Sequence, residues 1–160
     1  MAFDGFLKLA GIDGESQDSK HSGEIDITSY QFGASQTGAT PVGGGLGGGK
    51  VSVNDLQITK QTDKASPVLF QYCCTGQHIA TGTLTVRKAG TTQQEYLVMN
   101  LSDILVTNIT NGGSTSDDIP VENVSLTFSK IEIQYQQQKQ DGTLAGTIKK
   151  GYDVKKNQAV

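Results

Sequence analysis

The 160-residue chain has no tryptophan, only two cysteines, and few charged or apolar residues for its length. Charged residues make up 18% and hydrophobic residues 35%, and glycine, threonine, glutamine and serine fill the difference. This balance argues against a long solvated helix or coiled coil. A net charge of −3 argues against an acidic disordered chain. The length suits a single domain, 1–160, and we expect a small β-rich domain with a thin core.

Other missing features exclude further classes of protein. No apolar run reaches the roughly 18 residues of a membrane span, so we expect no membrane insertion. Basic residues form only short pairs such as Arg87-Lys88, so we expect no nucleic-acid partner. The N-terminus, Met1–Gly5, lacks the basic and apolar regions of a signal peptide, and any export should use a route that reads no such signal. The adjacent Cys73 and Cys74 are expected to be reduced thiols, because disulfides between sequence neighbours are strained.

Alternation of apolar and polar residues predicts strands over most of the chain. Ile25 and Ile27 begin one strand, Glu24–Phe32, in which the apolar side changes near Thr28, so this strand should bend there. Further strands are predicted at Phe6–Ile12, Val51–Ile58 (with a break near Asn54-Asp55), Thr83–Val86, Tyr96–Leu101, Ile104–Val106 and Val124–Tyr135, with a hairpin turn at Ala89–Thr92. In the last of these the apolar side changes after Phe128, which indicates a bulge or a strand that passes from one sheet to another.

Two segments break the strand pattern. Asp63–Pro67 offers a helix start with proline in the first turn, and Leu69 and Cys73 are at helical spacing, with Gly76 as a stop. This predicts one short α-helix over about 66–75, packed on the sheet through Leu69 and Cys73. The segment Gly33–Gly49 is poor in apolar residues and rich in glycine, and we predict a long Gly-rich loop over about 33–50.

The glycine-rich segment nearly matches a phosphate-binding loop. Gly44–Lys50 has the required spacing, but Val51 stands where Ser or Thr would hold magnesium, and a strand pattern follows in place of a helix. We therefore expect no bound nucleotide there.

Metal and catalytic sites find no better support. His21 and His78, with Cys73 or Cys74, do not fit the spacing of a compact zinc motif. The acidic segment Asp13–Asp18 lacks the glycine and terminal glutamate of a calcium loop. No constellation indicates catalysis, so we predict that the protein is not an enzyme and has no cofactor and no metal.

Motifs along essentially the whole chain resemble the haemolysin-coregulated protein (Hcp) family. They are, in order, Phe6–Ser16, His21 with Glu24–Asp26, the loop ending Gly49-Lys50, Asp63–Pro67, Arg87–Gly90, Glu95–Leu97, Glu122–Leu126, Tyr135, Gly142 and Gly151–Asp153. The chain departs from the family pattern at Tyr30, Phe32 and Tyr152, where tryptophan is frequent in the family. Aromatic volume is kept at these positions, so the same fold is expected.

The resemblance implies a β-barrel of two packed antiparallel sheets with one flanking helix, assembled in hexameric rings with a wide pore. It implies that such rings stack into the inner tube of a bacterial type VI secretion system, which a contracting sheath expels behind a tip spike, with small effector proteins in the pore. The implied partners are other copies of the chain, the spike, the sheath and effectors. The implied location is the bacterial cytoplasm, followed by secretion through the system. Two other readings fit the residues: a phage-tail-tube-like subunit, and a small β-sandwich binding module.

Two sets of residues are predicted to serve assembly. Glycine lets another backbone approach closely. Ring stacking is therefore predicted for the loop, together with the Ala89–Thr92 turn, namely Gly43, Gly44, Gly45, Leu46, Gly47, Gly48, Gly49, Ala89 and Gly90. In the strand Glu24–Phe32, Tyr30 and Phe32 should face the core and leave Ser29 and Gln31 on the opposite side. The resemblance favours a pore lining that includes Ser29 and Gln31.

Overall fold

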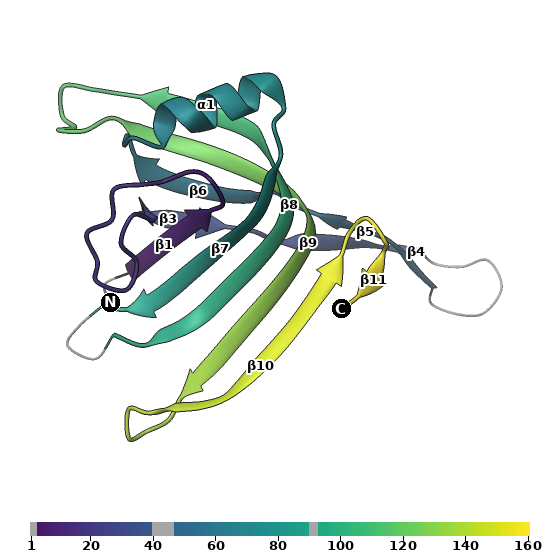
Figure 1. The fold of residues 1–160 in the computed structure, drawn as a ribbon. Coiled ribbons are helices and arrows are strands. Elements are labelled where there is room, and N and C mark those ends of the chain that lie inside the picture. Colours follow the sequence, from purple (N-terminus) through teal and green to yellow (C-terminus); the bar gives the residue numbers. More distant parts are fainter. Residues whose placement is uncertain (1–2, 40–46, 90–92) are drawn as a thin grey trace.

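The computed structural model describes residues 3–39, 47–89 and 93–160, which form one helix and eleven strands (Figure 1). The strands are β1 (Phe3–Leu9), β2 (Ile25–Ile27), β3 (Ser29–Gln31), β4 (Ala34–Ala39), β5 (Gly47–Val53), β6 (Leu56–Gln61), β7 (Ile79–Lys88), β8 (Glu95–Gly112), β9 (Val121–Gln138), β10 (Leu144–Asp153) and β11 (Gln158–Ala159). The helix is α1 (Ser66–Thr75). The predicted mainly β fold with one short helix is confirmed.

Nine strands form one antiparallel sheet in the order β11-β10-β9-β8-β7-β1-β2, with β6 paired to β9 and β3 paired to β6. β8 and β9 are its longest strands, with 18 residues each. β9 changes partner along its length, because Val121–Leu126 pair with β6 whereas residues from Lys130 onward pair with β10. The buried side chains of β9 change parity after Phe128, as predicted, and this change falls where β9 exchanges β6 for β10 as its neighbour. β9 nevertheless stays within one sheet and does not pass from one sheet to another.

The sheet wraps around the core (Figure 1). Two of its terminal strands, β2 and β3, are joined in the chain through Thr28. β2 ends at Ile27 and pairs with β1, whereas β3 begins at Ser29 and pairs with β6. Thr28 donates its backbone N–H to the carbonyl oxygen of Thr59 at 2.8 Å, and the predicted bend is confirmed. The expected barrel of two packed sheets needs one correction. A single sheet is bent round the core, and because β2 and β3 each pair with one neighbour, no continuous ladder closes it.

Helix α1 covers one side of the wrapped sheet (Figure 1). Leu69 is fully buried and the half-buried Cys73 packs against the core, as predicted. Gly76 ends the helix with a φ of 71°, and its N–H donates to the carbonyl oxygen of Tyr72 at 2.9 Å. Such a left-handed backbone favours glycine, which explains why the helix stops there. Within the described ranges, no helix is both long and apolar enough to cross a membrane.

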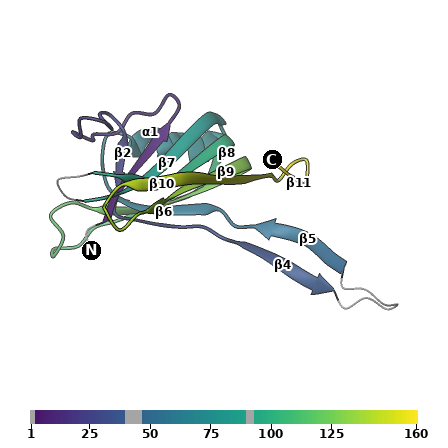
Figure 2. The ribbon, with the colours of Figure 1, turned by 90° about the horizontal axis from the view of Figure 1, so that it is seen from below.

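The segment predicted as a long loop is largely a β-hairpin. β4 and β5 pair as a separate two-stranded sheet, with Ala34 opposite Val53 and Gly38 opposite Gly48. The hairpin extends away from the body of the domain (Figure 2). It leaves residues such as Gln36 exposed. β4 and the glycine-rich start of β5 lack the apolar alternation that marks a strand in a sequence, whereas Val51 and Val53 at the end of β5 fall in the predicted strand Val51–Ile58. Four of the predicted stacking residues in this segment (Gly43, Gly44, Gly45 and Leu46) lie outside the described residues, as does Gly90.

Candidate functional site

The predicted pore-lining residues lie on a neutral polar surface formed by β3, β6 and β9. Ser29 and Gln31 are exposed, and Tyr30 between them is half-buried and packs against the core. β3 pairs with β6 so that Gln57 lies opposite Gln31 and Thr59 opposite Ser29. A groove of about 470 Å³ runs over this surface and is lined by Ser29, Tyr30, Gln31, Gln57, Ile58, Thr59, Asn108, Asn123, Val124 and Ser125. None of these lining residues is Asp, Glu, Lys, Arg or His, so the surface offers hydrogen bonds without net charge.

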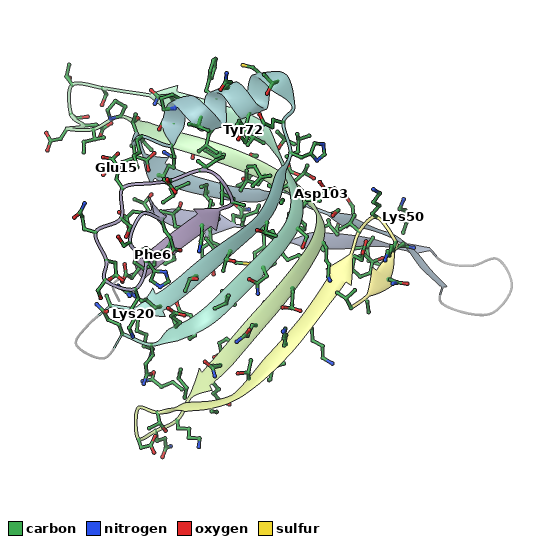
Figure 3. All side chains as sticks on the ribbon, viewed as in Figure 1. Phe6, Glu15, Lys20, Lys50, Tyr72 and Asp103 are labelled. Atoms are coloured by element: carbon green, nitrogen blue, oxygen red, sulfur yellow. The ribbon has the colours of Figure 1, made fainter. Side chains whose placement is uncertain are left out.

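The two predicted stacking segments lie at opposite ends of the molecule. The distal end of the β4–β5 hairpin, where β5 begins at Gly47, lies on one side, and the end of β7 lies on the other (Figure 1). Ala89, which is exposed, directly follows β7. Figure 3 shows the same separation, with Lys50 far from Phe6 and Lys20. The structure therefore does not bring the two segments together within one subunit.

An apolar surface extends from the core onto the ends of β8, β9 and β10. Leu97, Tyr135 and Ile148 are paired in a row across these strands. Tyr135 is 44% and Ile148 is 64% exposed, whereas Leu97 is half-buried. Tyr135 ends the predicted strand Val124–Tyr135 on the apolar side that follows Phe128, yet it is largely exposed, because this end of β9 pairs with β8 and β10 only and not with β6. The sequence signal that could have revealed the row is the even spacing of Leu144, Ile148 and Tyr152, which predicts that β10 has an apolar side of its own.

Next to this row lie an apolar cavity and a free strand edge. The cavity, at the base of the hairpin, has a volume of about 560 Å³, and Phe32, Val53 and Ile133 are among its lining residues. β10 pairs with β9 on one side and, at Tyr152 and Asp153 only, with β11 on the other. Within the described residues, most of the outer edge of β10 therefore has no strand partner, and unpaired edges favour pairing with another chain.

The residues weighed for a zinc site are separated in the structure. His21 Nδ1 lies 2.7 Å from Glu24 Oε2, and its Nε2 lies 2.8 Å from Glu95 Oε1. His78 pairs instead with Asp103 on an exposed surface, with 2.7 Å between Nδ1 and Oδ1. Among the residues that the structure describes, no group of His, Cys, Asp and Glu could hold a metal ion.

Arg87 organises a second cluster on the outer face of β1 and β7. It is only 2% exposed, and its Nε donates to Asp4 Oδ2 at 2.7 Å. Its two terminal NH groups donate to the carboxylate of Asp18. These hydrogen bonds, assisted by backbone N–H groups of Lys20 and His21, lower the pKa of Asp18 to about 2. Asp18, weighed as part of a calcium loop, is thus the partner of an arginine.

A buried polar network that the sequence analysis missed connects α1 to the sheet. Lys60 is fully buried, and its Nζ lies 2.8 Å from both Asp63 Oδ1 and Glu122 Oε2 and donates to Ser66 Oγ at 3.0 Å. Asn111 donates to Glu122 Oε1 at 2.9 Å. Burial tends to raise the pKa of Glu122, but the hydrogen bonds from Lys60, Ser66 and Asn111 outweigh it and lower this pKa. The network fixes the start of α1 against β6 and β9.

Comparison with known proteins agrees with this fold. The sequence matches the family described as "Type VI secretion system effector, Hcp" over residues 6–135. Protein hcp1 of Pseudomonas aeruginosa is 43% identical over 159 residues, covering 98% of each chain. Hcp1 from Salmonella typhimurium has a similar structure, with a TM-score of 0.81 and 37% identity over 100% of both chains. The structure of a type six secretion system protein has a TM-score of 0.94 at 28% identity, covering 99% of this chain and 100% of the other. These matches over nearly the whole chain confirm the resemblance, and the chain belongs to the Hcp family of type VI secretion system proteins.

Proposed function

We propose that the protein is a structural subunit of the type VI secretion inner tube, without enzymatic activity, and that it forms hexameric rings that stack. One observation carries the proposal. The apolar row of Leu97, Tyr135 and Ile148 lies beside the free edge of β10 on a surface that the subunit itself leaves uncovered. Exposed apolar residues beside an unpaired strand edge are typical of a surface that another chain covers.

A closed ring requires two different surfaces on each subunit, since each copy meets its neighbours head to tail. We assign one of these surfaces to the apolar row, the cavity at the base of the hairpin and the edge of β10. To be specific, the interface should bury at least about 1,000 Å² in total.

Stacking of rings also needs two different surfaces, one on each face of the ring. The hairpin end with Gly47–Gly49 and the turn that begins at Ala89 lie at opposite ends of the subunit, as this arrangement requires (Figure 1). In our proposal, the hairpin of one ring meets the turn of the next. Gly43–Leu46 and Gly90 complete the two contacts.

The neutral surface around Ser29 and Gln31 is assigned to the pore. Side chains that offer hydrogen bonds without net charge suit effector proteins of differing charge, because they repel neither acids nor bases. The tube assembles in the bacterial cytoplasm, meets a tip spike and a contractile sheath, and is then expelled.

Two substitutions of equally exposed apolar residues test the ring. Ile148→Asp places a charge in the apolar row, and Phe70→Asp places one on the outer side of α1, where Phe70 is 61% exposed. Because both side chains already face solvent, both variants should remain folded by circular dichroism. In light scattering, Ile148→Asp should release subunits while Phe70→Asp keeps the mass of the wild-type ring. A ring that survives Ile148→Asp would remove this surface from the interface, and a wild-type monomer would favour a small binding module instead.

A further inference from the structure

An ionic cross-link on the outer face joins the loop between β1 and β2 to the start of β8. His21 in this loop has a side chain that is only 8% exposed. Both of its ring nitrogens lie within 2.8 Å of a carboxylate oxygen, one from Glu24 and one from Glu95. A neutral imidazole has one N–H and one lone pair, and it can donate to only one carboxylate. An imidazolium, in contrast, can donate to both carboxylates in two charge-assisted hydrogen bonds.

The surroundings of His21 hold the ring in this orientation. Its ring stacks on Phe6 from β1, with centroids 4.3 Å apart and an angle of 7° between the planes. Arg87 from β7 packs on the same Phe6 ring and pairs with Asp4 and Asp18. The backbone N–H of His21 also donates to Asp18 Oδ1 at 3.2 Å. Since Arg87 occupies Asp4 and Asp18, the carboxylates left for the His21 ring are those of Glu24 and Glu95.

Glu95 is the first residue of β8. It and its neighbour Gln94 contact the loop between β1 and β2, the end of β7, and the turn between β9 and β10. The neighbouring Gln94 accepts the backbone N–H of Lys88 at 3.1 Å, which closes the turn between β7 and β8. The Gln94 side chain donates to the carbonyl oxygen of Gly142 at 2.6 Å, in the turn between β9 and β10. The ladder between β7 and β8 is irregular between Val86 and Arg87, just before this point. The His21–Glu95 contact therefore braces β8 beside the irregular end of this ladder.

We propose that His21, as an imidazolium, is a positioning residue that holds this end of the subunit in the shape that receives the hairpin of a second copy. The inference rests on the proposed stacking of rings, because Ala89, which is assigned to the stacking contact, directly follows Lys88, and Lys88 is hydrogen-bonded to Gln94 beside Glu95. Without the cross-link, the start of β8 would move more freely and a neighbouring ring would have to order it on contact.

The two carboxylates provide a matched pair of substitutions. Glu95→Gln removes the bond to β8, whereas Glu24→Gln removes a carboxylate from the same histidine without touching β8. His21→Phe keeps a ring for stacking on Phe6 and removes both hydrogen bonds. Asp103→Asn removes an exposed histidine–carboxylate pair elsewhere on β8 and serves as the distant control.

Hydrogen exchange of the backbone amides of residues 93–97 tests whether the His21–Glu95 contact, the brace, stabilises the start of β8. The measurement applies whether or not the protein forms rings. Loss of a charge-assisted hydrogen bond should raise this exchange about tenfold in Glu95→Gln and His21→Phe. Glu24→Gln and Asp103→Asn should stay near wild type. Unchanged exchange in Glu95→Gln would overturn the brace.

Tube growth, followed by electron microscopy and sedimentation, tests the link to stacking. Glu95→Gln should keep the ring mass and need a several-fold higher concentration to form tubes, and Asp103→Asn should behave as wild type. Faster exchange with normal tube growth would overturn the role in stacking while leaving the ring proposal intact. A wild type that forms no rings would overturn the proposed function, and the exchange measurement would still decide the brace.

The charge on His21 has its own spectroscopic test. The chain has only two histidines, so imidazole labelling with ¹⁵N gives a simple spectrum. The proposal predicts two protonated ring nitrogens for His21 in the wild type, and His21→Phe identifies its signals by their loss. A single protonated nitrogen on His21 would contradict the imidazolium.

Discussion

Replacing the buried Lys60 by methionine should be strongly destabilising. Methionine is unbranched and flexible, so Lys60→Met mainly removes the charge and its hydrogen bonds. The carboxylate of Glu122, which is 2% exposed, then stays buried without the ammonium group that faces it at 2.8 Å. Removing one partner of a buried ion pair costs about 3–5 kcal/mol. This is a large part of the roughly 5–15 kcal/mol that stabilises a typical domain.

The opposite substitution, Glu122→Gln, should cost less. Lys60 would still contact Asp63 and Ser66, and the amide oxygen of glutamine can still accept a hydrogen bond from Asn111. We expect a loss of about 1–3 kcal/mol, typical of a hydrogen bond to a charged group. The double variant should cost less than the sum of the two single changes, because once both groups are replaced, neither Lys60 nor Glu122 is left as a buried charge without its partner.

Urea unfolding at one fixed protein concentration, followed by circular dichroism, measures these costs. The concentration is held constant because association of subunits adds to the apparent stability. Lys149→Met is the matched control, because Lys149 pairs with Glu132 with 55% of its side chain exposed and should change stability by at most about 0.5 kcal/mol. The reasoning fails if Lys60→Met is no more costly than this control, or if Glu122→Gln costs more than Lys60→Met.

Three further outcomes are expected. The pKa of Asp18 is lowered from 3.8 to about 2 chiefly by Arg87, so its stabilisation is present above pH 3.8 and lost as the pH falls towards 2. Asp18→Asn should therefore lose less stability over this range in an acid titration, and an equal loss would contradict the assignment. Gln31→Glu and Gln31→Arg should leave the ring mass unchanged but alter retention of a cargo protein in pull-downs, unlike Gln71→Arg on α1; unaltered retention would remove Gln31 from the pore. Replacing residues 38–48 by an Asn-Gly turn should preserve fold and ring and weaken tube growth in electron micrographs, whereas loss of the ring would make the hairpin a structural element of the subunit.

Local patterns in the sequence were sufficient wherever a residue's neighbours decide its conformation. The helix 66–75 follows from the proline in its first turn and from Gly76, and the bend at Thr28 follows from the change of apolar side between Ile27 and Tyr30. Exposure of Ser29 and Gln31 follows from the same change. Each of these signals lies within a few residues of the structure that it predicts.

Features that depend on distant partners could not be read in this way. β4 and the start of β5 carry no apolar alternation, and their glycines suggested a loop; only Val51 and Val53 at the end of β5 gave a strand pattern. His21 meets Glu95 across 74 positions of sequence, and no spacing rule predicts such a contact. The burial of Lys60 could have been predicted, because Lys60 continues the inward alternation of Leu56 and Ile58. A lysine at such a position needs a buried partner.

The central claim is that this chain assembles into a closed hexameric ring. Light scattering coupled to size-exclusion chromatography, at micromolar concentration, tests it most directly, with a particle image to show the shape. The account predicts six times the 16.9 kDa mass of the chain and a ring with an open centre. A mass of one or two chains under the same conditions would contradict it.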